Sequence, residues 1–102
     1  MKPESPKIAD IRERFKSSLL DKADVLGGYL DKIVESEELN VELLSELRED
    51  LHKLAGSTGM YGYDDLAKMS REAMDLIDAG DEFGSEQKVL AIHNLLKQYA
   101  KK

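Results

Sequence analysis

Cysteine is absent from this chain of 102 residues, so neither a disulfide framework nor thiolate chemistry is available to it. Both prolines lie within the first six residues, and none interrupts the chain after them. No run of about 18 apolar residues occurs, so no membrane-spanning segment is expected. A basic surface is also lacking, because the formal net charge is −6, and binding to a phosphate backbone requires one. We therefore expect a cytoplasmic protein that binds neither membrane nor nucleic acid.

Helix-forming residues at helical spacing make up most of the chain. Hydrophobic residues account for 41%, which is enough for a modest core in one compact domain. Apolar residues recur at every third or fourth position, and no stretch alternates with period two, which favours an all-α fold. Because the connections are short, we predict an antiparallel up-and-down four-helix bundle over residues 7–102, with a short extra N-terminal helix as an option. Residues 1–6 are predicted to form a disordered arm.

The first apolar stripe extends over residues 8–34. It predicts either one long helix or two helices with a bend near Leu20–Asp21. Gly27–Gly28 lies in the middle of this segment, where each glycine costs roughly 1 kcal/mol relative to alanine. We interpret the pair as a point of close helix packing or a kink. Residues 36–40 are expected to connect this segment to the next.

Polar residues and glycines mark the ends of the other three predicted helices. Asn40 is expected to cap the second helix, and a break follows at residues 59–63. The third helix begins with a cap at Asp64 or Asp65, and Gly80 is well placed to end it. Ser85 is expected to cap the fourth. The apolar face of the second helix consists of Val41, Leu44, Leu47, Leu51, Leu54, Ala55 and Thr58.

Residues 52–62 read His-Lys-Leu-Ala-Gly-Ser-Thr-Gly-Met-Tyr-Gly, which joins a histidine to three glycines inside a helical domain. On a helical wheel, at 100° per residue, His52 lies on the flank of the apolar face. Arg48 is one turn before it and Gly56 is one turn after it. A partly exposed imidazole therefore has a cation on one side and bare backbone on the other. This arrangement suggests that another macromolecule comes close to His52.

The string resembles the histidine-containing phosphotransfer (HPt) domain of two-component phosphorelays. The likeness continues into Asp64-Asp65-Leu66-Ala67 and covers the whole predicted bundle. It implies that His52 accepts a phosphoryl group on an imidazole nitrogen, from a response-regulator receiver domain or from a sensor histidine kinase, and passes it to another receiver. Gly56 would let the receiver approach the helix closely, while Gly59 and Gly62 would shape the turn that closes the site. The partner surface is expected to comprise Gly56, Arg48, Lys53 and Glu49.

Two positions depart from the family pattern. The family usually has lysine three residues after the histidine, and this chain has Ala55. Arg48, Lys53 or Arg71 could supply the missing charge, and we favour Arg48 because it shares the flank of His52.

Many family members also place glutamine or glutamate on the third helix, hydrogen-bonded to the histidine. At the matching spacing this chain has Met74. Ser70, Arg71 and Asp75 are nearby in sequence, and the spacing does not choose between them.

Other chemistries have little support. The chain lacks the Walker pattern and any kinase-like ATP motif, so no ATP-dependent kinase activity of its own is expected. His52 and His93 are 41 residues apart without further His or Cys spacing, so no metal site is expected. We interpret His93 as structural. No cofactor is expected on this chain, because the magnesium ion for transfer would belong to the receiver, and a monomer is the simplest assembly.

Two functions from different classes therefore remain open. The first is a phosphorelay carrier that works through His52. The second is a catalytically silent adaptor or inhibitor with the HPt fold, which binds a receiver or kinase without accepting phosphate.

Overall fold

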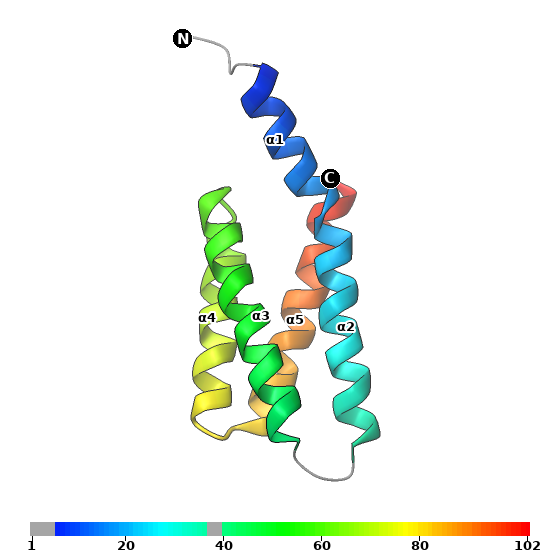
Figure 1. The fold of residues 1–102 in the computed structure, drawn as a ribbon, viewed down its shortest axis with the longest axis vertical. Coiled ribbons are helices and arrows are strands. Elements are labelled where there is room, and N and C mark those ends of the chain that lie inside the picture. The colour runs from blue at the N-terminus through cyan, green and yellow to red at the C-terminus, as the bar shows by residue number, and fades with distance from the viewer. Residues whose placement is uncertain (1–5, 37–39) are drawn as a thin grey trace.

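The computed structural model describes the backbone of residues 6–36 and 40–102, and the side chains within these ranges from residue 10 onward. In this part of the chain there are five α-helices and no strand, in agreement with the predicted all-α bundle and its extra N-terminal helix (Figure 1). The predicted arm lies outside the described residues except for Pro6, which begins the first helix. The helices are α1 (Pro6–Ser17), α2 (Leu19–Glu35), α3 (Val41–Met60), α4 (Asp64–Asp78) and α5 (Glu82–Lys101).

Helices α2 to α5 form the bundle, and α1 extends beyond one end of it (Figure 1). Helix α3 packs along α4, α2 packs along α5, and contacts between α4 and α5 join the two pairs. Helices α2 and α3 touch only slightly, which leaves a hollow between them. The fully buried large side chains are mostly aliphatic and include Leu19, Leu47, Leu51, Leu66, Val89, Ile92 and Leu96. Since α3 and α4 lie side by side, residues along their shared edge form one continuous surface.

Two helices rather than one cover residues 8–34, and they meet at Ser18, slightly before the predicted bend at Leu20–Asp21. The Ser18 hydroxyl donates to the Phe15 carbonyl at 2.5 Å, and such competition for a helical carbonyl bends helices. The Phe15 ring also stacks on Tyr61 in the turn after α3, with ring centroids 4.1 Å apart. These contacts fix the end of α1 against the bundle.

Gly27 allows α2 and α5 to pack closely. Close packing was one of the two interpretations of the Gly27–Gly28 pair, and a kink was the other. A Cβ at Gly27 would lie 3.2 Å from Cε1 of His93 on α5. The His93 ring spans the two helices, because its Nδ1 lies 2.7 Å from the Ala23 carbonyl oxygen, which can only accept a hydrogen bond. This geometry agrees with a structural role for His93. Gly28 has no atom within 4 Å of an added Cβ, so the packing explanation does not extend to it.

The turn between α3 and α4 is shorter than predicted. Helix α3 continues through Gly59 to Met60, and the turn occupies residues 61–63. A Cβ at Gly59 would lie 3.6 Å from Cβ of Ala67 on α4, so Gly59 belongs to the contact between the helices rather than to the turn. Gly62 has a φ of +86°, a conformation that favours glycine, and it reverses the chain.

Two predicted helix ends are confirmed. Asn40 caps α3 by accepting a hydrogen bond from the Leu43 N–H at 3.0 Å, and Gly80, with a φ of +76°, ends the last turn of α4. The predicted apolar face of α3 was wrong at its start, because Val41 is 72% exposed whereas Leu43 is buried. Two residues correspond to about 200° around a helix. Leu43 is therefore in line with Leu47, and Val41 points away from the bundle.

Two other cap predictions were wrong. The N-cap of α4 is Tyr63, which makes no side-chain cap bond, and residues 64–65 form the first helical turn. Their carboxylates still interact favourably with the positive end of the helix dipole. Asp81 rather than Ser85 caps α5, since its carboxylate accepts from the Gly84 N–H at 2.8 Å. Ser85 is buried within the first turn instead.

Candidate functional site

A hollow of about 440 Å³ lies along the shared edge of α3 and α4, open to solvent. It is lined by His52, Ala55 and Gly56 of α3 and by Arg71, Met74 and Asp75 of α4. Positions i, i+3 and i+4 share a helix face, so each helix contributes one face to this hollow. His52 is exposed while Leu51 beside it is fully buried, which is the flanking position that the helical wheel predicts.

The imidazole of His52 makes no hydrogen bond or ion pair with any residue that the structure describes. Its ring nitrogens are therefore accessible from solvent. Because α3 continues for two further turns past His52, the ring stands on a regular helix rather than on a loop. A nucleophile in this setting is held at a fixed height above the bundle surface.

Gly56 lies one turn after His52 and is exposed. An added Cβ there would meet no heavy atom within 4 Å, so no contact in the described part of the chain requires a glycine. Glycine in a helix interior nevertheless costs roughly 1 kcal/mol relative to alanine. No packing contact of the described chain offsets this loss of helix stability. Gly56 leaves the backbone next to His52 without a side chain.

The floor of the hollow is apolar. Ala55 is 7% exposed and Met74 is 9% exposed, and neither side chain can donate a hydrogen bond. These are the two positions where the HPt resemblance implies lysine and glutamine or glutamate. The usual support around the histidine is thus replaced by packed hydrocarbon and a thioether.

Arg48 does not line the hollow, because its guanidinium is bound to Asp78 near the end of α4. Its Nε lies 2.7 Å from Asp78 Oδ1, and its Nη2 lies 2.9 Å from Oδ2. These hydrogen bonds hold the pKa of Asp78 below its ordinary value and raise that of Arg48. We favoured Arg48 as the substitute cation because it shares the flank of His52, but the structure shows its guanidinium bound to Asp78 instead of pointing into the hollow.

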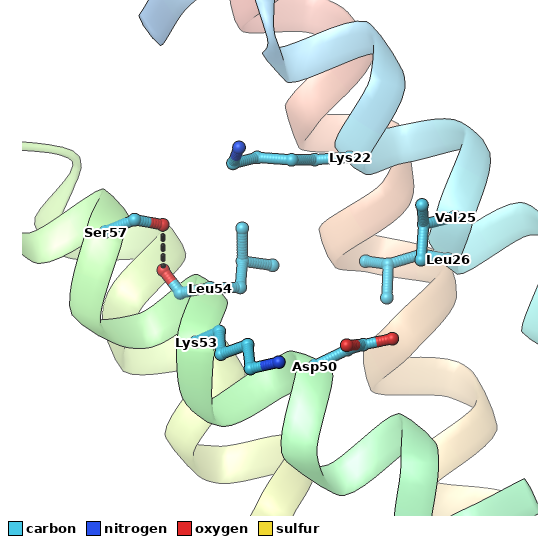
Figure 2. A pocket seen from close by; sticks show the side chains of 7 residues that line it. All are labelled: Lys22, Val25, Leu26, Asp50, Lys53, Leu54 and Ser57. Carbon is cyan, nitrogen blue, oxygen red and sulfur yellow. Dashed lines mark hydrogen bonds between the residues drawn. The ribbon is translucent and has the colours of Figure 1, made fainter.

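Lys53 lies on the opposite side of α3 from Arg71. It lines a second hollow, of about 360 Å³, between α2 and α3. Figure 2 shows the Lys53 side chain extending toward Asp50, with Lys22 and Val25 of α2 on the other side of the hollow. Its Nζ is 3.8 Å from Glu49 Oε1, and both side chains are 70% exposed, so this ion pair contributes little. Lys53 and Glu49 are accessible to a partner, but neither lines the His52 hollow.

The α4 residues that the sequence left undecided are separated by the structure. Ser70 is buried, and its hydroxyl donates to the Leu66 carbonyl at 2.8 Å, so it faces the core. Arg71 and Asp75 line the hollow with His52. Arg71 is the only lysine or arginine among the residues that line the hollow. It forms no ion pair with any residue in the described ranges. The sequence placed Arg71 among three candidates, and the register of α4 against α3 was needed to select it.

No cluster of three or more His, Cys, Asp or Glu side chains that could hold a metal ion occurs in the described part of the chain. Among residues 6–36 and 40–102, no helix has both the length and the apolar character needed to cross a bilayer.

Comparison with protein-family models identifies a family for this chain. A family model described as "Hpt domain" matches residues 10–102 and so includes both faces of the His52 hollow. No curated protein matches the chain, and no solved structure matches it either.

Proposed function

The chain belongs to the Hpt domain family, and from this premise we propose that His52 is the residue on which it carries a phosphoryl group. Domains of this family take part in histidine phosphotransfer in two-component signalling, where they interact with receiver domains and histidine kinases and act as phosphocarriers rather than kinases. One observation supports the assignment to His52 most strongly. The exposed, unbonded imidazole lies one turn from Gly56, a glycine that no contact in the described chain requires.

The phosphoryl group moves in two steps of the same kind, first from an aspartate to His52 and then from His52 to another aspartate. A lone pair on a neutral His52 nitrogen attacks the phosphorus of an aspartyl phosphate on the receiver. The N–P bond forms as the P–O bond to the carboxyl group breaks, and the electron pair leaves with the carboxylate. A second receiver aspartate then attacks the phosphorus, and the bonding pair returns to the imidazole. Magnesium held by the receiver would neutralise charge on the phosphoryl oxygens.

The chain contributes position and access to this exchange. Phosphoryl transfer depends mainly on alignment and charge stabilisation, with little covalent work for the scaffold. A regular helix fixes the height of the His52 ring, and the bare backbone at Gly56 lets the partner's loops approach to van der Waals distance. We propose that the protein works in this way as a cytoplasmic monomer that brings no metal of its own.

A second candidate function is a silent adaptor or inhibitor that occupies a receiver or kinase without accepting phosphate. The apolar floor formed by Ala55 and Met74 favours it, because the residues that usually support the reactive histidine are missing.

One labelling experiment separates the two functions. The chain is incubated with phosphorylated receivers or a phosphorylated histidine kinase, and acid-labile, base-stable phosphate is measured. A carrier becomes labelled, and the label disappears in His52→Gln but remains in His93→Gln. If the wild-type chain stays unlabelled with several competent donors while it still binds one of them, the adaptor replaces the carrier.

A further inference from the structure

A phosphoryl group on His52 would stand in a hollow with few partners for its charge. It carries about −1.5 to −2 charges at neutral pH and offers three strong acceptor oxygens. The floor residues Ala55 and Met74 donate nothing, Gly56 has no side chain, and Asp75 adds a negative charge. The whole chain has a net charge of −6, so the surroundings also repel an anion. A stable phosphohistidine therefore needs a cation at this place.

Arg71 is positioned to be that cation, and two contacts between α3 and α4 show its level along the bundle. The first contact is Gly59 with Ala67, whose Cβ lies 3.6 Å from a Cβ built on the glycine. Four residues back along α3 from Gly59 is Ala55, and four residues forward along α4 from Ala67 is Arg71. In an antiparallel pair these steps cover the same distance, so Arg71 lies level with Ala55.

The Arg48–Asp78 ion pair gives the same register from the other end of the hollow. Seven residues forward from Arg48 is Ala55, and seven residues back from Asp78 is Arg71. Both contacts place Arg71 about one helical turn beyond His52, on the side where Gly56 leaves the surface open. A phosphoryl group on the imidazole that extends toward this opening comes within reach of a long guanidinium side chain.

The other two candidate cations are engaged elsewhere. Arg48 makes two short hydrogen bonds with Asp78, which would have to break before it could bind phosphate. Lys53 lies on the α2 side of α3 and lines the other hollow. Arg71 has no ion-pair partner among the described residues, so binding an anion costs it no existing contact.

We propose that the Arg71 guanidinium binds the phosphoryl group carried by His52, donating its planar pair of N–H groups to two phosphoryl oxygens. This inference rests on the proposed function of His52. Arg71 forms no covalent bond and stays protonated throughout, while the N–P bond forms and breaks as described above. Two parallel N–H···O bonds suit a tetrahedral anion, and a lysine ammonium would provide the charge without that geometry.

The test compares wild type with Arg71→Gln and Arg71→Lys. Lys97→Gln serves as the matched control, because it removes one positive charge from an exposed position on another helix, α5. Transfer from a phosphorylated receiver should fall roughly tenfold or more in Arg71→Gln, recover partly in Arg71→Lys and stay unchanged in Lys97→Gln. Urea denaturation should show equal stability in all four proteins, since Arg71 has no intramolecular ion pair to lose.

A second measurement does not depend on any protein partner. His52 is phosphorylated chemically with phosphoramidate. Its phosphohistidine signal in the ³¹P NMR spectrum is identified as the one that His52→Gln lacks. The chemical shift of this signal is then followed as the pH is changed. Loss of the adjacent cation should raise the pKa of the phosphoryl group by roughly half a unit in Arg71→Gln but not in Lys97→Gln. If the phosphoryl group has the same pKa in wild type and in Arg71→Gln, the proposal is overturned. Wild-type protein that receivers fail to label would instead count against the proposed function, and the titration would still decide whether Arg71 binds the phosphate.

Discussion

Gly56→Ala should make the protein more stable and less active at the same time. The added Cβ meets no heavy atom within 4 Å, and Gly56 lies in the interior of α3 without a positive φ. The substitution should therefore gain the helix propensity of alanine, about 0.8–1 kcal/mol. For a domain of this size, 1 kcal/mol raises the melting temperature by roughly 4 °C or more.

Phosphotransfer should change in the opposite direction. The new methyl group would stand one turn from His52, where the receiver is proposed to approach the backbone. A displacement on the order of 1 Å between reacting groups can cost roughly a hundredfold in rate. We expect the rate of transfer from a phosphorylated receiver to fall roughly 10- to 100-fold, as measured by rapid-quench labelling alongside thermal denaturation.

Gly28→Ala is the matched control for this experiment. Gly28 is also exposed inside a helix, and an added Cβ there also meets nothing within 4 Å, but it lies on α2. It should show the same gain in stability with an unchanged transfer rate. Full activity in Gly56→Ala would refute the idea that bare backbone serves the partner, and a loss of stability would refute the free space that the structure shows.

Three further changes test individual contacts. Gly62→Ala places a side chain at a φ of +86°, so urea denaturation should show a loss of roughly 1–2 kcal/mol, and an unchanged midpoint would contradict the strain. Asp78→Asn removes the ion pair with Arg48 and should lower the melting temperature at pH 7. Because folding lowers the pKa of Asp78, this difference should persist above the ordinary aspartate pKa and vanish as the pH falls through the lowered value; a difference that grows in acid would exclude this linkage. His93→Leu loses the 2.7 Å bond to the Ala23 carbonyl and should cost about 1 kcal/mol in denaturation, while labelling stays normal if His93 is only structural.

The fold was largely predictable because its signals are local. Apolar spacing identified the helical bundle, and Asn40 and Gly80 mark helix ends through chemistry contained in a few residues. Errors arose where two nearby residues could do the same job. Asp81 and Ser85 are both good N-caps, and only the turn after Gly80 determines which one reaches an open N–H group. Val41 is apolar like the core residues of α3, but it does not lie on the buried face of the helix, which is the face that carries Leu43 and Leu47.

The candidate site was predictable on one helix and not across two. The helical wheel places His52 and Gly56 on the exposed flank of α3 without knowledge of any other element. The charges around them depend on α4, whose register against α3 is a tertiary property. Arg48 shares the flank of His52 in the wheel, yet its partner is Asp78, thirty residues later in the chain. Arg71 reaches the hollow for the same reason, since only the packing of α4 brings it level with Ala55.

The central claim is that His52 both receives a phosphoryl group and gives it up. The chain is labelled with ³²P through a phosphorylated donor, purified from that donor, and mixed with an unphosphorylated receiver and Mg²⁺. The label should leave His52 and appear on the receiver aspartate, at a rate faster than hydrolysis of the phosphohistidine alone. A chain that never takes up label on His52, or that keeps its label in the presence of every receiver that binds it, would contradict the carrier function.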